Sequence, residues 1–600
     1  LYGTLKNPKN LHQKIWNFFA QGNQTTDQSR SFEWEFQAAG AGLWEEAARQ
    51  ALAATGQAGA KEDFKTENWY LDRSLRWVQK IPADKRRYGL LLDIYRERGN
   101  FFARQGELDK AISEYSRQLK MARKLKKPEE VADAYNRLGN QFRQKPDYPK
   151  AEQNLKKALG LLERLGKDFE VSRTYNNLGA TYAHQLRLEE ALNHYTRAAE
   201  IQHRLGATKN LAVTLNNIGT AHVLADRFQE GVRFFREALQ LNRKLDEKEQ
   251  TALCLNNLGF ILCQRGECDG AKTLLLEALE LNRQIGSQKW EVLNLDNLAI
   301  AAYRSGNYPE AIRYALFGLE LSEKINFKGS HLSLLATLGG SLKAQGQYAE
   351  AEKYLTYGLS LVEEVHDLPS EIPLRLEKIE LTLLVNDLPE AEKAAAEASE
   401  RIQGVSDRSL RARLFMLLAK LAAHRGKVAE MRKHLGEAEK VLAESEYFPE
   451  RHRLALERVE LSKLQDRTEK IEELLLSVRT LSGVPVNSTL TCEQLFLEAQ
   501  SALHLGQFTT ARQKGGDALK LAYDLSEPEK IWRLHHLLAK LWMEEKNYQK
   551  AFLELQKSAQ ILESLKSNFE TEENLARYFQ DPEKIQLLSE INRVADVLGR

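Results

Sequence analysis

Asparagine recurs every forty residues in the middle of this chain, and a side-chain amide is suited to hydrogen-bond a peptide backbone. Asn177, Asn217, Asn257 and Asn297 occupy the same place in stretches that read YNNLG, LNNIG, LNNLG and LDNLA. Each amide offers an N–H donor and a C=O acceptor, which complement the C=O and N–H groups of an extended peptide. Asparagine costs a helix roughly 0.5 to 0.7 kcal/mol relative to alanine, so its repetition indicates a purpose other than helix formation.

Two roles are open for these amides. They contact a ligand laid along one face of the helices, or they bond to one another as a ladder between neighbouring helices. We expect the ligand role for the four asparagines above. For the preceding Asn176, Asn216 and Asn256 we expect the ladder role, because their side chains should point closer to the adjacent repeat.

The elements that position these amides repeat with the same period of forty. The turn GELDKA at residues 106–111 is followed by similar turns at every fortieth residue, ending with KNYQKA at 546–551. These turns define twelve repeats without an insertion, each predicted to be a helix A, the turn and a helix B. The abundance of Leu, Ala, Glu, Lys, Arg and Gln, with only 13 prolines, agrees with a nearly all-helical chain.

Small residues mark where the helices of a repeat should approach closely. Helix A carries Gly139 or its equivalent, and helix B carries a small, large, small pattern such as Ala151, Leu155 and Ala158. We expect each helix B to stop at a residue that tolerates the left-handed conformation. The predicted stops are Gly166, Gly206, Asp246, Gly286 and Asn326.

These residues resemble the tetratricopeptide repeat family over about residues 85–565. The forty-residue unit is similar to those of kinesin light chains, Pins-type adaptors and the repeat arms of bacterial signal-transduction ATPases. The resemblance implies an all-α fold, a right-handed superhelical α-solenoid with helices A lining the concave surface. It also implies that Asn177, Asn217, Asn257 and Asn297 bind a peptide, as the groove asparagine does in peptide-binding members.

We expect three parts in the chain: an atypical N-terminal helical cap at 1–84, twelve tandem repeats at 85–566 and a C-terminal capping helix at 567–600. Asp581 should cap that last helix, with Pro582 at its first position. Aromatic density predicts that the N-terminal part covers the first repeat, the alternative being that it packs against a domain outside this sequence. The tryptophans concerned are Trp16, Trp34, Trp44, Trp69 and Trp77.

Cations and polar residues extend the predicted binding face beyond the amides. Arg137 and Arg304 flank the asparagines, where they clamp a carboxylate or phosphate or remain solvated helix surface. The full predicted partner-binding set is Arg137, Arg173, Asn177, His184, Asn217, Asn257, Gln264, Asn297 and Arg304. Farther on, Arg413, Arg453 and Arg533 share the register of Arg173 and predict a second stretch for an anionic partner.

Composition and missing motifs narrow the function. A net charge of +2 over 600 residues gives no overall attraction for nucleic acid or an anionic membrane. Four cysteines in so long a chain favour a reducing, cytoplasmic location, and Cys268 should be a small core residue. There is no apolar run of membrane-spanning length, and no phosphate loop, zinc motif or G-x-S-x-G elbow. We therefore expect neither a cofactor nor an enzyme.

The sequence as a whole predicts a non-catalytic scaffold that binds an extended segment of a partner protein in its concave groove. The alternative is the sensory or regulatory arm of a multidomain signalling ATPase or kinase whose catalytic domain lies outside this sequence. The chain begins with Leu1 rather than methionine, which suggests a segment of a longer protein. A phosphate loop encoded upstream of Leu1 would decide for the alternative.

Overall fold

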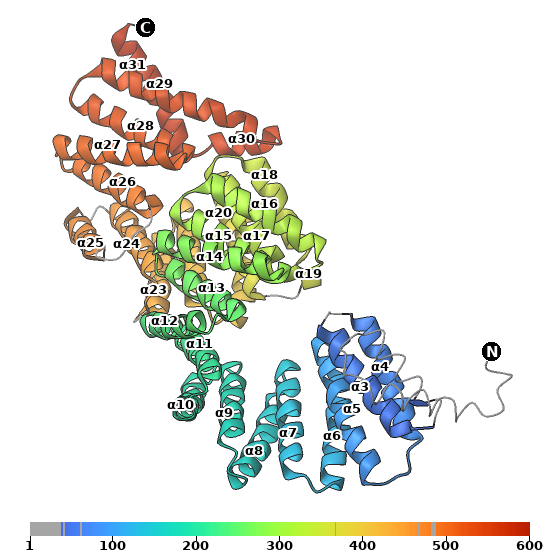
Figure 1. Cartoon of the computed structure of the whole chain (residues 1–600). Helices are drawn as coiled ribbons and strands as arrows, with labels where there is room; N and C mark the ends of the chain where they lie inside the picture. The colour runs from blue at the N-terminus through green and yellow to red at the C-terminus, as the bar shows by residue number, and fades with distance from the viewer. Residues whose placement is uncertain are drawn as a thin grey trace, which may run out of the picture. The chain divides into compact units, whose positions relative to one another are not determined.

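Every regular element that the computed structural model describes is a helix (Figure 1). The structure describes residues 38–39, 42–60, 63–365, 368–443, 445–465, 468–481 and 488–599. The chain divides into two compact units, unit 1 (Leu1–Leu224) and unit 2 (Ala225–Arg600). Each unit is an α-solenoid in which consecutive helices pack in pairs, and the predicted fold class is confirmed at this level.

From Trp44 onward, unit 1 consists of a hairpin followed by the first helices of the forty-residue pattern. The hairpin consists of α3 (Trp44–Ala60) and α4 (Phe64–Gln79). The helices that follow are α5 (Lys85–Arg104), α6 (Leu108–Lys124), α7 (Pro128–Gln144), α8 (Tyr148–Arg164), α9 (Asp168–Ala183), α10 (Leu188–Arg204) and α11 (Thr208–Leu224). The odd-numbered helices from α5 onward are the helices A of this unit, and the even-numbered ones are its helices B.

The forty-residue period continues through the sequence of unit 2. Its helices A are α13 (Lys248–Gln264), α15 (Gln288–Ser305), α17 (His331–Ala344), α20 (Leu368–Leu384), α22 (Arg408–His424), α24 (Phe448–Lys463), α26 (Ser488–His504) and α28 (Pro528–Glu544). Its helices B are α12 (Phe228–Lys244), α14 (Cys268–Ile285), α16 (Tyr308–Lys324), α18 (Tyr348–Ser360), α21 (Leu388–Arg401), α23 (Val428–Leu442), α25 (Thr468–Leu481), α27 (Phe508–Leu525) and α29 (Tyr548–Leu565). Shorter pieces are η2 (Lys328–Ser330), α19 (Val362–Val365), η3 (Ile402–Gly404) and η4 (Lys566–Asn568).

Residues with positive φ end the helices B where the sequence predicts. The φ angles are 64° at Gly166, 65° at Gly206, 53° at Asp246, 76° at Gly286 and 51° at Asn326. A residue in this left-handed region turns the chain out of the helix, and the next helix A begins two residues later except after Asn326, where η2 precedes α17. All five predicted helix ends are confirmed.

Glycine on helix A allows the close helix crossing that the sequence predicts. A Cβ atom built on Gly139 would lie 2.5 Å from Leu155 Cγ, and one built on Gly179 would lie 2.6 Å from Tyr195 Cδ1. Leu155 is fully buried, as is the neighbouring Ala151. The large side chain of helix B therefore fills the space left by the missing side chain of helix A.

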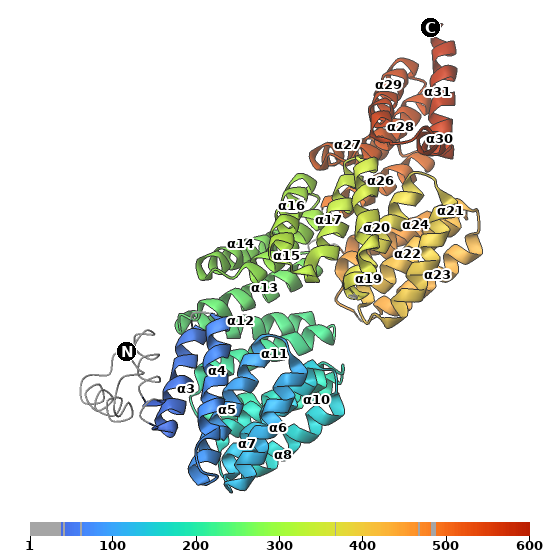
Figure 2. The same cartoon turned by 90° about the vertical axis from the view of Figure 1, so that its right-hand side faces the viewer.

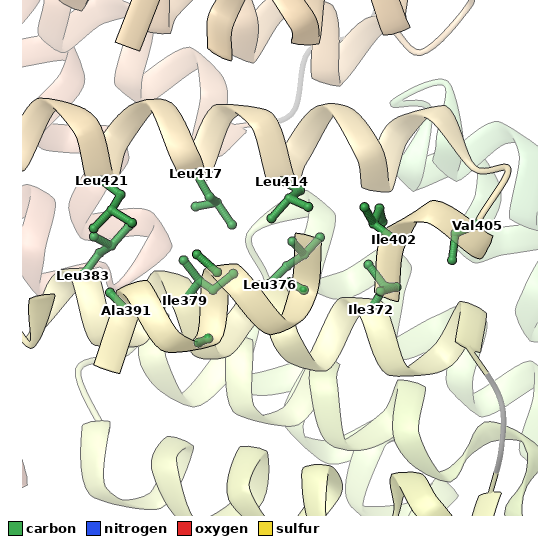
Figure 3. Packing of buried hydrophobic residues seen from close by; sticks show 13 residues of the cluster. Ile372, Leu376, Ile379, Leu383, Ala391, Ile402, Val405, Leu414, Leu417 and Leu421 are labelled. Atoms are coloured by element: carbon green, nitrogen blue, oxygen red, sulfur yellow. The ribbon is translucent and has the colours of Figure 1, made fainter. Parts of the chain in front are cut away.

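The core consists of apolar side chains at helical spacing on facing helices. Figure 3 shows one such cluster in unit 2, where α20 and α22 face each other. Ile372, Leu376 and Ile379 on α20 pack against Leu414 and Leu417 on α22, and all five are buried. Side chains three or four residues apart share one helical face, so each helix presents a single apolar stripe to its neighbour.

The hairpin α3–α4 packs on the first repeat through aromatic residues. The rings of Trp44 and Trp77 stack at 5.6 Å between centroids, and Lys80 Nζ lies 4.2 and 4.6 Å from the two centroids. Val78 and Leu90, on either side of the α4–α5 turn, belong to the same cluster. The hairpin therefore shares a core cluster with the first repeat, and the capping role of residues 1–84 stays a prediction. Trp16 and Trp34 lie outside the described residues.

Two helices follow the last repeat, α30 (Glu572–Phe579) and α31 (Pro582–Leu598). The side chain of Asp581 accepts hydrogen bonds from the backbone N–H groups of Glu583 and Lys584, and Pro582 occupies the first turn, as predicted. The sequence predicts one helix here and does not anticipate α30. Figure 2 shows α28, α29 and α31 packed together at the C-terminal end of unit 2.

Residues about five repeats apart meet inside unit 2. The hydroxyl of Tyr348 donates to Glu529 Oε1 over 2.6 Å, across 181 residues of sequence. The backbone N–H of Gln229 donates to Glu446 Oε2 over 3.0 Å, across 217 residues. These contacts join early and late repeats of unit 2. Side chains between those repeats therefore face another repeat of the same unit.

Candidate functional site

The four predicted asparagines all lie on helices A. Asn177 is on α9 and Asn217 on α11, in unit 1, whereas Asn257 is on α13 and Asn297 on α15, in unit 2. All four side chains are half-buried. We call the strip formed by the adjacent helices α5, α7, α9 and α11 the helix-A face of unit 1.

In unit 1 each asparagine is tied to the helix A before it. Asn177 Nδ2 donates to Asn136 Oδ1 over 3.3 Å, and Asn217 Nδ2 donates to Asn176 Oδ1 over 3.1 Å. Each amide therefore uses one N–H within the fold. The side-chain oxygens of Asn177 and Asn217 have no hydrogen-bond partner among the described residues, so they remain available to a ligand.

The preceding asparagines are the acceptors that join neighbouring repeats. Asn176 Oδ1 also accepts from the hydroxyl of Thr214 over 3.2 Å. In unit 2, Asn256 Oδ1 accepts from Asn294 Nδ2 over 2.8 Å and from Asn297 Nδ2 over 2.9 Å. The predicted ladder role is confirmed for Asn176 and Asn256.

Asp296 replaces asparagine at this acceptor position in the next repeat. The hydroxyl of Ser333 donates to Asp296 Oδ1 over 2.8 Å, and only 8% of Asp296 is exposed. Burial raises the pKa of Asp296 from its ordinary value of 3.8 to about 7, because no cation compensates a charge there. The ladder thus ends in a carboxyl group that titrates near neutral pH.

The predicted cations of unit 1 have different surroundings. Arg137 Nε donates to Asp133 Oδ2 over 2.7 Å, and Arg137 Nη1 donates to Asn100 Oδ1 over 2.5 Å. Its charge is therefore partly compensated within the fold. Arg173, one turn before Asn177 on α9, is exposed.

His184 lies beside an arginine that the sequence analysis does not single out. Arg143 Nη1 lies 3.0 Å from His184 Nε2, and the two residues come from the ends of α7 and α9. Burial lowers the pKa of His184, and the charge of Arg143 lowers it further. Arg143 could have been identified from its position in the repeat, because Lys343 stands at the equivalent position five repeats later.

In unit 2 the remaining predicted site residues are enclosed. Arg304 Nη1 donates to the carbonyl of Cys263 over 3.5 Å, and Arg304 Nη2 lies 3.8 Å from Glu450 Oε1. The side-chain oxygen of Gln264 is buried and has no hydrogen-bond partner among the described residues. These two residues therefore face the interior of unit 2.

Arg413 of the predicted second stretch belongs to a buried ion network. Arg413 Nη2 lies 3.0 Å from Glu377 Oε1 and 3.1 Å from Glu380 Oε1, and Lys343 Nζ donates to Glu377 Oε2 over 2.7 Å. Burial alone would raise the pKa of Glu380, but the charges of Lys343 and Arg413 hold it well below its ordinary value. The two carboxylates therefore compensate the positive charges of Lys343 and Arg413 within the fold.

The other two arginines of that stretch also face carboxylates. Arg533 Nε lies 3.2 Å from Glu583 Oε2. The charge of Arg453 acts together with neighbouring lysines to lower the pKa of Glu493 against the effect of burial. Because the positive charge of all three arginines is opposed by carboxylates of unit 2, we do not carry the second stretch into the proposed function.

Nothing in the described part of the chain assembles a metal centre from His, Cys, Asp and Glu. Cys268 is buried, as predicted for a core residue, and its sulfur lies 3.5 Å from that of Cys263. None of the described helices is both long enough and apolar enough to cross a membrane.

Solved structures are similar to this chain at low sequence identity, and three examples follow. BtubC (BKLC) from P. vanneervenii is 24% identical, with a TM-score of 0.33, over 36% of this chain and 89% of that one. A chain of the APC/C hetero-tetramer Cut9-Hcn1 is 11% identical, with a TM-score of 0.49. The match covers 91% of this chain and 96% of that one. The quorum sensor NprR from B. thuringiensis is 15% identical, with a TM-score of 0.44, over 60% and 99%. No curated protein sequence matches the chain.

The model of the tetratricopeptide repeat family matches four overlapping windows of this sequence, at residues 90–164, 130–204, 170–244 and 210–284. Successive windows begin forty residues apart, which is the period of the turns, the glycine crossings and the asparagine ladder. These windows include Asn177, Asn217 and Asn257. Residues 90–284 therefore match the tetratricopeptide repeat family.

Proposed function

We propose that the helix-A face of unit 1 binds an extended segment of a partner protein, with the side-chain amides of Asn177 and Asn217 holding the backbone of that segment. The fold belongs to a repeat family of protein-binding scaffolds and regulators. A solenoid of this kind offers its ligands a long surface rather than a deep pocket. The proposal assigns no catalytic step to the chain.

One observation carries the proposal. Asn177 and Asn217 each give one amide N–H to the preceding helix A and keep the side-chain oxygen unengaged by any described residue. The internal hydrogen bond fixes the rotamer of the amide, so its oxygen is held in place before a ligand arrives. The free oxygen can accept a backbone N–H, and the second amide N–H can donate to a backbone carbonyl.

The spacing of the repeats suits an extended chain. Packed helices lie about 8 to 10 Å apart, and an extended peptide rises about 3.3 Å per residue. Roughly three residues of ligand therefore separate the amide of Asn177 from that of Asn217. Arg173 is exposed one turn from Asn177 and belongs to the proposed face.

The same register continues in unit 2 with Asn257 and Asn297. Asn297 repeats the internal hydrogen bond of its counterparts in unit 1, through Asn256. We do not extend the proposal to these two amides, because Arg304 and Gln264 near them are enclosed by unit 2 itself.

The experiment is a binding screen followed by substitution. The purified chain is incubated with an array of short random-sequence peptides, and the strongest binder is titrated by fluorescence anisotropy. The double variant Asn177→Ala, Asn217→Ala should bind this peptide at least about tenfold more weakly, since two backbone hydrogen-bonding groups are lost.

Asn193→Ala provides the matched control, because Asn193 is exposed on the helix B α10. It should leave the affinity unchanged. If no peptide on the array binds, or if the double variant binds as tightly as the wild type, the proposed function is wrong.

A further inference from the structure

Three cations share one register near the ends of helices A, and two of them donate to a side-chain oxygen 37 residues later. Lys343 donates to Glu380, which lies 37 residues later. Lys463 likewise donates to Gln500 Oε1 over 2.6 Å, again 37 residues later. The third cation is Arg143, and the residue 37 places after it is Ala180.

The surroundings of Arg143 lack a carboxylate. Its Nε atom is buried without a hydrogen-bond partner, and its only hydrogen-bond contact within the described residues is the ring nitrogen of His184. No carboxylate oxygen of the described residues lies within 4.0 Å of the guanidinium. Burial lowers the pKa of Arg143, and only the hydroxyls of Tyr195 and Tyr148 oppose this effect. A half-buried guanidinium in this state favours an anion nearby.

The ion network of unit 2 shows what such a cation binds when the chain supplies it. Lys343 contacts the carboxylates of Glu377 and Glu380, 34 and 37 residues later. The corresponding residues after Arg143 are Asn177 and Ala180. Alanine supplies no carboxylate at the position where unit 2 has Glu380, and Asn177 offers an amide instead of a charge.

We propose that the site formed by Arg143, Asn177, Ala180 and His184 binds an acidic side chain of the partner segment. The carboxylate of an aspartate or glutamate would lie over Ala180, beside Arg143 and His184, where Glu380 lies beside Lys343 in unit 2. This inference rests on the proposed function and deepens it, because it names the chemistry of one ligand residue. A peptide bound to the helix-A face of unit 1 should therefore carry a negatively charged residue near Asn177.

The test uses the strongest binder of the peptide array, in which each acidic residue is replaced in turn by its amide or by phosphoserine. With the wild-type protein, one such amide replacement should weaken binding about tenfold, since a charge-assisted pair is lost. With Arg143→Gln the same replacement should change the affinity by less than about twofold. Arg164→Gln, at an exposed arginine on α8, is the matched control and should keep the acid preference.

A second variant, Ala180→Glu, tests the same inference independently. It supplies the missing carboxylate from the protein itself, so it should abolish the preference for an acidic ligand residue while the chain remains folded. Circular dichroism of the variant checks the fold. In the wild type, binding of the acidic peptide should raise the pKa of His184 measured by NMR, and binding of the amide-substituted peptide should not.

The outcomes separate this inference from the proposed function. Peptides that bind through Asn177 and Asn217 but tolerate every amide replacement would overturn the acidic site and leave the proposed function standing. Retention of the acid preference in Arg143→Gln would also overturn it, as would a stronger preference for phosphoserine than for aspartate or glutamate. Failure of every peptide to bind would overturn both.

Discussion

The side-chain amide of Asn217 donates to the side-chain oxygen of Asn176 over 3.1 Å and so joins two successive helices A. The two roles that the sequence leaves open for the repeated asparagines, ligand contact and ladder, are thus compatible in one side chain. Asn176 serves the ladder by accepting from both Asn217 and Thr214. The side-chain oxygen of Asn217 accepts no hydrogen bond from the described residues.

The first prediction concerns the ladder. Asn176→Ala removes the acceptor of two hydrogen bonds between repeats and should lower the free energy of unfolding by about 1 to 3 kcal/mol. Urea denaturation followed by circular dichroism measures the change. The exposed Asn193→Ala should change the free energy by no more than about 0.5 kcal/mol. Equal stability of the two variants would show that the ladder does not stabilise unit 1.

The second prediction concerns the glycine crossing. Gly139→Ala places a Cβ atom 2.5 Å from Leu155 Cγ and should cost about 1 to 3 kcal/mol of unfolding free energy. Gly160→Ala, on α8, meets no atom within 4 Å and should stabilise the chain by roughly 0.5 to 1 kcal/mol. The opposite signs of the two changes, measured by thermal unfolding, distinguish close packing from helix propensity. A stabilising Gly139→Ala would contradict the crossing described above.

The third prediction concerns the pH dependence of stability. The pKa of Asp296 is about 7 in the folded chain and has the ordinary value of 3.8 in the unfolded chain. Between these values the folded chain holds a proton that the unfolded chain has lost, so the contribution of Asp296 to stability falls as the pH rises from about 4 to 7. Asp296→Asn cannot ionise and should be more stable than the wild type by about 4 kcal/mol at about pH 8, with little difference near pH 4.

Denaturation curves at both pH values check this prediction, and the exposed Asp269→Asn serves as the control. A gain from Asp296→Asn that is equally large near pH 4 would mean that the carboxyl group is unfavourable for a reason other than its charge.

The fourth prediction concerns the buried network of unit 2. Glu377 accepts from Lys343 and Tyr303 and pairs with Arg413, and its side chain is 3% exposed. Glu377→Gln leaves part of the buried positive charge uncompensated and should lower the unfolding free energy by about 3 kcal/mol. The exposed Glu320→Gln should have almost no effect. Comparable stability of the two variants would mean that the network contributes little.

Local features of the fold were predictable from the sequence because they depend on neighbours within one repeat. Gly139 and Leu155 are sixteen residues apart, and their contact recurs with the period, as does the left-handed residue at Gly166. Register also assigned Asn176 to the ladder, whereas the ligand role of Asn177, which itself donates to Asn136, stays a prediction.

Contacts between distant repeats were not predictable, because they depend on small rotations accumulated from one repeat to the next. Tyr348 meets Glu529 across 181 residues, and no local pattern encodes this pairing. Arg413 illustrates the consequence for the site. Its register matched the predicted anion-binding position, but Glu377 and Glu380 of the preceding repeat neutralise it.

The central claim is that the amides of Asn177 and Asn217 hold the backbone of a bound peptide. A double-mutant cycle tests it most directly, by combining Asn217→Ala in the protein with replacement of single backbone amides of the bound peptide by esters, which remove one N–H donor each. We predict that one ester replacement weakens binding to the wild type about tenfold and has no further effect on binding to Asn217→Ala. The same loss in both proteins, at every peptide position, would contradict the account.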